Sequence, residues 1–252
     1  FDDPSSNSYA GITDTSSLSF TTSFTTQVVE NILTSEDAAS LIEEQGTDVV
    51  IPDGVTSIGR SAFDYNGSTP STLTSVVIPD SVTSIGDKAF RGTKLTSIEI
   101  PDSVISIGRE AFTFSELTSV DIGDGVISIG EYAFNATDLT SVEIPDGVTS
   151  ISDGAFGSTN LTSVEIPDGV TSIGVVAFAN VPLTSVDIGD SVTSIGRMAF
   201  MNNYSLTSVD IPDSVTSIGD EAFIRSGLTS VDIGDGVTSI GVNAFAETQL
   251  TS

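Results

Sequence analysis

The sequence contains no cysteine, no histidine and no tryptophan, and only seven of its 252 residues are lysine or arginine. Without thiols and imidazoles the chain cannot form disulfides or Cys/His metal sites, and it has neither a Cys nucleophile nor a His general base. These absences exclude most familiar hydrolase mechanisms. They leave the redox compartment open, because a chain without thiols is indifferent to it.

The shortage of basic residues leaves a formal charge of −28, because 35 residues are Asp or Glu. Nucleic acids and anionic membranes select basic surfaces, so neither is expected as a partner. No apolar run approaches the roughly 18 residues of a membrane-spanning helix, so direct membrane insertion is not expected. With 38% hydrophobic residues, the chain can nevertheless bury a core.

A repeated Ala-Phe dipeptide organises most of the chain. Its phenylalanines stand at Phe63, Phe90, Phe112, Phe134, Phe156, Phe178, Phe200, Phe223 and Phe245. The steps between them are 27, then 22 five times, then 23, then 22 residues. A period of about 20–29 residues with Leu, Val and Ile at fixed offsets is typical of a leucine-rich-repeat solenoid, whose units bury their apolar faces by stacking. We therefore predict one quasi-linear domain of nine units.

Within one unit, the segment Leu117–Ile122 has the pattern of a short strand. Its period-2 alternation places Val120 and Ile122 inward and Ser119 and Asp121 outward. A Pro or Gly follows this segment in every unit. Either residue should end the strand in a turn.

The second half of the unit supplies the rest of the core. Val126 and Ile129 alternate inward as a second short extended piece, and Phe134 should stack on its equivalents along the solenoid. The residues between Gly130 and Phe134 could form a single helical turn, which is too short for an independent helix. We expect mainly short parallel strands and turns.

These units resemble the BspA-like class of leucine-rich repeat, whose pattern is close to L-x-x-[VI]-x-I-P-D-S-V-x-x-I-G-x-x-A-F. The resemblance covers residues 49–252, and Ser152 in place of the usual Gly is a local departure. It implies a curved solenoid with a parallel sheet on one face. It also implies a secreted or surface-displayed protein that bacteria or protists use for adhesion, with a protein or glycan of a cell surface or matrix as its partner.

The residues before the array divide into two segments. Residues 1–17 are rich in Ser, Asp and Thr and are expected to be a linker or disordered. Residues 18–48 are expected to form a helical N-terminal cap, with Ser35 at the start and Gly46 at the end of the better helix. A separate functional domain is the alternative. An earlier segment is ambiguous: Phe24, Val28, Val29, Ile32 and Leu33 fall at helical spacing, whereas Leu18, Phe20 and Phe24 could start a strand.

The two ends of the sequence favour the expectation of a longer protein. The sequence begins at Phe1 rather than Met, and its last three residues, 250–252, repeat the opening of another unit. We expect a piece of a longer protein. Its open C-terminal coil could associate with another copy of the chain.

Two rows of carboxylates are predicted on the sheet face, one at the outward strand position and one just past the strand. At a strand spacing of about 4.8 Å, two unit charges in water repel by about 0.9 kcal/mol. Bound calcium could offset this repulsion, because hard cations select carboxylate and carbonyl oxygens. The alternative is a solvated acidic face, since Asp after Pro is ordinary in turns and no known calcium motif is present. The candidate ligands are Asp121, Asp124, Glu143, Asp146, Glu165, Asp168, Asp187, Asp190, Asp210, Asp213, Asp232 and Asp235.

Threonines also recur at fixed positions, including Thr96, Thr118, Thr149 and Thr171. Regular threonine arrays can match ice or a mineral surface, but here Ser follows each Thr directly and the spaced Thr-x-Thr pair is missing. Hydrogen bonding along the ladder is the better interpretation.

Sequence variation is confined to two places in each unit, the pair after Ile-Gly and the tail after Ala-Phe, which we call the variable edge. All seven basic residues lie there. A protein partner is not periodic, so the uniform sheet suits a polymer, mineral or ion row, or no ligand, and aperiodic recognition belongs at the variable edge. Tolerant loop variation is the alternative. The candidate partner-binding residues are Arg109, Phe114, Tyr132, Arg197, Met198, Met201, Tyr204, Ile224 and Arg225.

Catalysis is not expected, because the carboxylates occupy like environments on an open surface, whereas glycoside chemistry needs two acids in different environments. We predict a non-catalytic adhesion or interaction scaffold, extracellular or at the cell surface, without a cofactor other than a potential calcium ion. The alternative is a structural spacer array whose acidic rows bind calcium, a mineral or another periodic surface.

Overall fold

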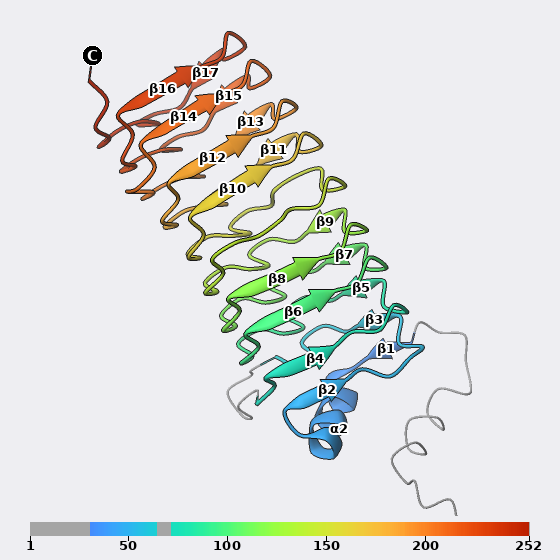
Figure 1. The fold of residues 1–252 in the computed structure, drawn as a ribbon. Coiled ribbons are helices and arrows are strands. Elements are labelled where there is room, and N and C mark those ends of the chain that lie inside the picture. Colours follow the sequence, from blue (N-terminus) through green and yellow to red (C-terminus); the bar gives the residue numbers. More distant parts are fainter. Residues whose placement is uncertain (1–30, 65–71, 252) are drawn as a thin grey trace, which may run out of the picture.

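The computed structural model describes residues 31–64 and 72–251, which form one elongated solenoid of stacked coils (Figure 1). The predicted leucine-rich-repeat architecture is thereby confirmed. The predicted linker 1–17 and the ambiguous segment up to Val29 lie outside the described residues.

Most coils contain one longer and one shorter strand, and all named strands pair in parallel with strands of other coils. The longer strands are β2 (Asp48–Val50), β4 (Ser75–Val77), β6 (Ser97–Ile100), β8 (Ser119–Ile122), β10 (Ser163–Ile166), β12 (Ser185–Ile188), β14 (Ser208–Ile211) and β16 (Ser230–Ile233). The shorter strands are β1 (Ile32–Leu33), β3 (Ser57–Ile58), β5 (Ser84–Ile85), β7 (Ser106–Ile107), β9 (Ser128–Ile129), β11 (Ser172–Ile173), β13 (Ser194–Ile195), β15 (Ser217–Ile218) and β17 (Ser239–Ile240).

The predicted inward and outward alternation is confirmed in β8. Ile122 is buried and Val120 half-buried, whereas Ser119 and Asp121 are exposed. The second residue of each shorter strand is also buried, except Ile240 of the last strand β17, so the coils close around an apolar interior.

The phenylalanines of the Ala-Phe pairs form a continuous stack through this interior. Successive rings lie 5.1–5.6 Å apart, centroid to centroid, with interplanar angles of at most 8°. The rings from Phe90 to Phe223 have no exposed surface. Offset stacking of this kind adds favourable ring contacts to the burial of apolar area. The predicted stack is confirmed.

The N-terminal end of the solenoid carries the helix α2 (Ser35–Gln45), which lies beside β2 (Figure 1). Thr34, rather than the predicted Ser35, is its N-cap. The Thr34 side chain accepts a hydrogen bond from the Asp37 backbone, and the Asp37 side chain accepts one from the Thr34 backbone. This reciprocal capping box satisfies two free donors of the first turn. Gly46 ends the helix as predicted.

Helix α2 covers the first coil with Ala38 and Leu41, which are almost fully buried in the common core. The helix that the spacing of Ile32 and Leu33 predicts is not formed. These residues form β1, in which Leu33 pairs with Ile58 of β3. Pairing with the next coil determines the conformation here, because it supplies backbone hydrogen bonds that an isolated short helix lacks.

The residue that follows a longer strand largely decides whether that strand pairs with the preceding coil. In the pairs β6–β8, β10–β12 and β14–β16, glycine follows the second strand and proline the first. Gly123 N, for example, donates to Ile100 O at 2.9 Å. Proline has no N–H to donate, so the ladder stops before coils that carry it. The pair β2–β4, with proline after both strands, is the exception.

Close approach of neighbouring coils explains the glycine of each Ile-Gly. A Cβ on Gly130 would lie 2.6 Å from the carbonyl carbon of Gly108, closer than backbone and Cβ atoms can pack. Gly130 N therefore donates directly to Ile107 O at 2.8 Å. At the equivalent position, Ser152 donates instead through its hydroxyl, to Ile129 O at 2.6 Å.

The coil that carries Ser152 is the irregular one. Within the described ranges it is the single coil without a named strand, and an isolated bridge from Ile151 to Ile173 replaces the short-strand pairing. The ring spacing widens from 5.1 Å between Phe112 and Phe134 to 5.5 Å between Phe134 and Phe156, and it stays at 5.5–5.6 Å as far as Phe200. The departure at Ser152 thus coincides with an interruption of the strand ladders.

The segment between Gly130 and Phe134 is a turn, so the predicted helical turn is wrong. Tyr132 has a left-handed backbone (φ 57°), and every equivalent residue from Ser61 to Asn243 shares this conformation. A left-handed residue does not propagate a right-handed helix. The neighbouring coil fixes this geometry, because Tyr132 N donates to Asp153 O at 2.8 Å.

Candidate interaction surfaces

The sheet face carries the two predicted rows of carboxylates. Their strand register places like charges directly opposite one another in three pairs: Glu99 with Asp121, Glu165 with Asp187, and Asp210 with Asp232. Adjacent strands of a sheet are about 4.8 Å apart, so these carboxylates repel unless solvent or salt screens them. Glu143 belongs to the irregular coil and has no strand partner.

Carboxylates of the second row also hold the solenoid together, a role that the sequence analysis missed. An aspartate after proline accepts a hydrogen bond from the backbone N–H of the aspartate after glycine in the next coil. These bonds join Asp124 N to Asp102 (3.0 Å), Asp190 N to Asp168 (3.1 Å) and Asp235 N to Asp213 (2.8 Å). They reinforce the same pairs of coils as the strand ladders.

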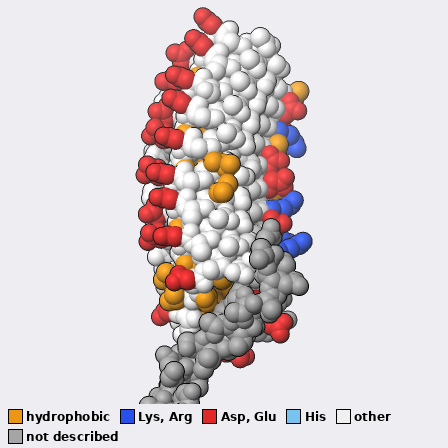
Figure 2. Space-filling model, turned by 90° about the vertical axis from the view of Figure 1, so that its right-hand side faces the viewer, with side chains coloured by type: hydrophobic (Ala, Val, Ile, Leu, Met, Phe, Trp, Pro, Cys, Tyr) orange, Lys and Arg blue, Asp and Glu red, His pale blue; other side chains and the backbone are white. Residues whose placement is uncertain are grey.

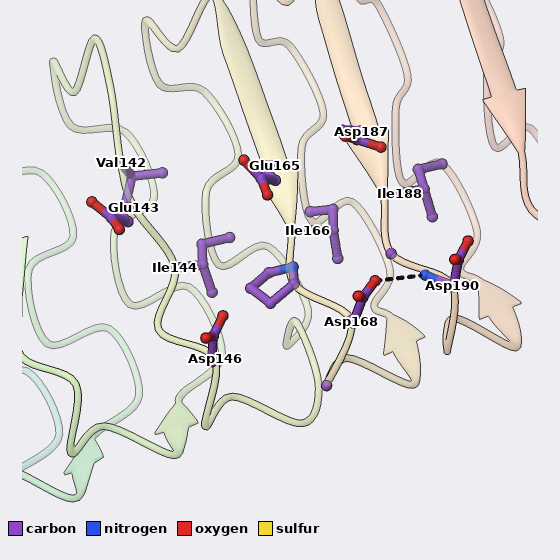
Figure 3. A pocket seen from close by; sticks show the side chains of 13 residues that line it. Val142, Glu143, Ile144, Asp146, Glu165, Ile166, Asp168, Asp187, Ile188 and Asp190 are labelled. Atoms are coloured by element: carbon purple, nitrogen blue, oxygen red, sulfur yellow. Dashed lines mark hydrogen bonds between the residues drawn. The ribbon is translucent and has the colours of Figure 1, made fainter.

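A groove of about 850 Å³ opens on this face beside the irregular coil (Figure 3). The buried side chains of Ile144, Ile166 and Ile188 line its floor. Carboxylates of the two rows, such as Glu165 and Asp168, stand on either side of these isoleucines (Figure 3). The arrangement is an acidic strip with an apolar floor.

The predicted calcium ligands are spread along the rows rather than gathered. Within residues 31–64 and 72–251, no group of three or more Asp or Glu side chains is placed to hold a metal ion together. Calcium usually takes six to eight oxygen ligands, so a pair of neighbouring carboxylates supplies only part of a site. Calcium binding stays a prediction.

The repeated threonines donate hydrogen bonds to the neighbouring coil. Thr118 Oγ1 donates to Thr96 O at 3.0 Å, and Thr171 Oγ1 donates to Thr149 O at 3.1 Å. Hydroxyl protons used in this way are not available to an ice or mineral surface. The geometry favours the interpretation of these threonines as ladder residues.

The variable edge lies away from the acidic rows. Figure 2 shows a column of Asp and Glu side chains along one side of the molecule, with Lys and Arg side chains on the opposite side. A second left-handed residue occurs in each tail from Gly92 to Glu247, with φ between 53° and 66°. Each unit of the edge therefore has the same backbone, whereas its side chains differ.

Near the N-terminal end of the edge, three cations surround Glu110. Its carboxylate lies 3.5 Å from Lys88 Nζ, 3.7 Å from Arg91 Nη1 and 3.2 Å from Arg109 Nε. Burial alone would raise the pKa of Glu110, but the hydrogen bonds and charges of Arg109 and Lys88 outweigh it and lower the pKa.

Internal contacts bring together two predicted partner-binding residues, Arg109 and Tyr132. The Arg109 guanidinium lies 5.9 Å from the centre of the Tyr132 ring and 2.9 Å from Glu131. The Tyr132 ring in turn covers Gly154, where a Cβ would collide with it. This part of the edge is fixed by its own contacts.

Farther along the edge, Arg197 pairs with Glu221 at 3.4 Å and Arg225 pairs with Glu247 at 2.9 Å. The hydrogen bond from Arg225 lowers the pKa of the Glu247 carboxyl. The same bond raises the pKa of Arg225, with smaller contributions from Glu221 and Tyr204. These exposed pairs leave the guanidinium groups accessible to a partner.

Two aromatic rings project from the variable edge into solvent. Phe114 is 65% exposed and Tyr204 is 68% exposed. Met201 and Ile224 are half-buried at the start of the tails after Phe200 and Phe223, and Met198 is half-buried in the pair after Ile195-Gly196. The edge therefore offers separated aromatic and cationic groups, and the structure does not gather all the predicted residues into one patch.

Some variable positions are structural. Asp87, Asp153 and Asp220 directly follow the Gly or Ser of the glycine position, and each accepts a hydrogen bond from a backbone N–H of the next coil at 2.7–2.9 Å. Their recurrence as Asp in an otherwise variable pair was the available signal. No signal in the sequence singles out Asn180 and Asn202, whose side chains are joined by a 2.7 Å hydrogen bond.

The last coil exposes apolar side chains at its end. Ile233, Ile240 and Val242 are 38%, 50% and 70% exposed, and β16 and β17 each pair on one side. Association with another copy through this coil stays a prediction.

One protein-family model matches most of the chain. The model of the BspA type leucine rich repeat region matches in six copies, over residues 38–157, 68–182 and 127–252. No curated protein sequence matches the chain. Within the described part of the chain, no helix is long and apolar enough to cross a membrane.

The chain is similar to several solved bacterial structures, of which the one from Eubacterium ventriosum supports the same fold. A leucine-rich repeat protein from Bacteroides ovatus is 26% identical over 78% of this chain and 69% of its own, with a TM-score of 0.41. A leucine rich cell surface protein from Faecalibacterium prausnitzii is 29% identical over 85% of this chain and 66% of its own (TM-score 0.46). A leucine-rich repeat protein from Eubacterium ventriosum is 21% identical over 79% of this chain and 59% of its own (TM-score 0.54).

Proposed function

Because this chain belongs to the BspA-type leucine-rich-repeat family, we propose that it is a non-catalytic interaction scaffold that acts outside the cell or at the cell surface. Leucine-rich repeats generally mediate interactions between proteins, and BspA-like members are typically found at cell surfaces. The chain spans 66% and 59% of the length of two of the solved structures that it resembles.

One observation carries the proposal: exposed side chains differ from coil to coil along the variable edge, whereas those of the sheet face repeat. The surface of a protein partner does not repeat, so only side chains that also differ from coil to coil can recognise it specifically. Exposed Tyr204 and Arg225 belong to the residue types that interface centres favour. The variable edge is therefore the recognition surface.

The absence of catalysis follows from the carboxylates. They are the abundant titratable groups of the chain, and those of the sheet face lie in equivalent positions on an open surface. Acid–base catalysis by two carboxylates requires environments that separate their pKa values. The carboxylates of the sheet face occupy equivalent positions, so they lack such different environments.

A binding comparison of two triple variants tests the proposal. The fluorescently labelled chain is titrated onto a panel of cells and immobilised matrix proteins. The edge variant carries Arg197→Glu, Tyr204→Ala and Arg225→Glu, and the matched sheet variant carries Glu143→Gln, Glu165→Gln and Asp187→Asn. We expect the edge variant to bind at least about tenfold more weakly and the sheet variant to bind like the wild type. Unchanged binding of the edge variant would contradict the assignment of recognition to this edge.

A further inference from the structure

A second groove, of about 380 Å³, lies on the variable edge between the tails of three successive coils. Ser158, Asn160, Asn180, Pro182, Asn202 and Tyr204 contribute to its walls. None of the lining residues, all of them within the described ranges, is charged. An uncharged groove of this kind is notable in a chain with a formal charge of −28.

An inserted residue builds the wall that carries Tyr204. The tail after Phe200 contains one residue more than its neighbours, and Asn203 is fully buried beneath it. Asn203 Nδ2 donates to Phe178 O at 2.9 Å, and Asn203 O accepts from Leu206 N and Gly227 N at 3.1 Å each. The insertion is thus anchored, and it holds the Tyr204 ring out into solvent.

The polar groups of the groove come from two asparagines in left-handed conformation, Asn180 (φ 59°) and Asn202 (φ 60°). Asn202 Nδ2 donates to Asn180 Oδ1 at 2.7 Å. Asn202 Oδ1 is buried and has no hydrogen-bond partner among the described residues. An unpaired buried acceptor is unfavourable, and a donor on a ligand would offset this cost.

We propose that this groove binds a neutral glycan. The exposed Tyr204 ring offers an apolar face for the C–H face of a sugar ring, with a hydroxyl at its rim. Amide side chains supply both donors and acceptors for sugar hydroxyls. The absence of charge among the lining residues gives no electrostatic advantage to a polyanion or a basic peptide.

The size of the groove agrees with this ligand class. Its volume falls within the range of about 300–1,000 Å³ that small-ligand sites occupy. The tails of neighbouring coils stack side by side, so a linear oligosaccharide could extend from the groove along the edge. The inference rests on the proposed function, because it assigns a ligand class to one part of the same recognition edge.

The test uses the full chain and immobilised neutral oligosaccharides of hexoses and N-acetylhexosamines, with heparin as the polyanionic comparison. We expect at least one neutral oligosaccharide to bind and heparin not to bind. Tyr204→Ala should weaken that binding by about tenfold or more, and Asn180→Asp should do the same by adding a charge and removing amide donors. Tyr204 is exposed, so its truncation should leave the thermal unfolding temperature close to that of the wild type.

Two matched variants serve as controls. Asn243→Asp makes the same change at another left-handed asparagine (φ 58°), and Ile127→Ala truncates another exposed side chain (52%), both outside the groove. Binding should be unchanged in both. Failure of every neutral oligosaccharide to bind, or equal binding by Tyr204→Ala and wild type, would overturn the groove assignment.

The same chain applied to cells distinguishes this failure from failure of the proposed function. Binding to cells that protease treatment abolishes and neutral oligosaccharides do not compete would indicate a protein partner, so the groove assignment alone would fall. Absence of binding to every cell and matrix preparation would overturn the scaffold function as well. Binding that neutral oligosaccharides compete and protease-treated cells retain would support both.

Discussion

The sheet side and the variable edge of this solenoid have equally regular backbones but very different sequence freedom. On the sheet face, neighbouring coils pack so closely that a Cβ on Gly123 would lie 2.6 Å from the carbonyl carbon of Pro101. On the edge, the backbone N–H of Tyr132 contacts the next coil and the side chain does not have to repeat. Where the backbone makes the contact that stacks the coils, the side chain is free to vary.

The left-handed backbone conformation at the edge costs free energy, and the sequence does not reserve these positions for glycine. Non-glycine residues pay about 1–2 kcal/mol for this conformation, and even the β-branched Val176 adopts it (φ 51°). Hydrogen bonds to the next coil hold the backbone there, as Val176 N donates to Arg197 O at 3.0 Å. Regularity of the edge is therefore a property of the stack rather than of the residues.

The largest expected difference between core and edge compares two phenylalanines. Phe178→Ala removes a ring with no exposed surface from the central stack and should destabilise the chain by about 3–5 kcal/mol. Phe114→Ala removes an edge ring that is 65% exposed and should change stability by about 0.5 kcal/mol or less. Urea unfolding of both variants measures the difference. Equal losses would show that the edge ring is part of the core.

A smaller effect is expected where the repeat itself is broken. A Cβ on Gly196 would lie 2.6 Å from the Gly174 carbonyl carbon, so Gly196→Ala must separate two coils and should cost about 1–3 kcal/mol of folding free energy, measured by urea unfolding.

Ser152→Gly makes the reverse change in the irregular coil and should allow the short strand ladder to continue from β9 to β11. Hydrogen exchange should then slow at the amides of residues 151–153. Unaltered exchange there would mean that Ser152 is not what interrupts the ladder.

The period of the sequence predicts most of the fold. The spacing of Ala-Phe, the alternation in Ser119–Ile122 and the turn at Gly123 each specify a contact that the structure contains. The helix ending at Gly46 is also predictable, because capping chemistry is local.

The parts that sequence did not predict depend on contacts between coils. The strand β1, the left-handed turn at Tyr132 and the hydrogen bonds that aspartates such as Asp102 accept all need a neighbour that the local sequence does not specify. The same is true of the uncharged groove, since Asn180 and Asn202 are 22 residues apart in sequence and meet only in the stack. A repeated sequence specifies its coil better than the surface that adjacent coils form together.

The smallest expected effect concerns the part of the edge that is structural rather than open to partners. Glu110→Gln removes the carboxylate that Lys88, Arg91 and Arg109 surround, and at neutral pH it should destabilise the chain by about 1 kcal/mol or less, because the site is partly solvated. Glu247→Gln removes one exposed pair, with Arg225, and should have a smaller effect.

The pH dependence of this loss identifies its cause. The pKa of Glu110 is lower in the folded chain than the unfolded value of about 4.3, so its stabilisation is fully present above that value and disappears as the pH falls through the folded pKa. Wild type and Glu110→Gln should therefore differ in thermal unfolding temperature at neutral pH and converge in acid. A difference that persists at the lowest pH would instead reflect lost packing, since a protonated carboxyl has no charge to pair. Convergence would mean that charge fixes this end of the edge, leaving partner recognition to the coils around Tyr204.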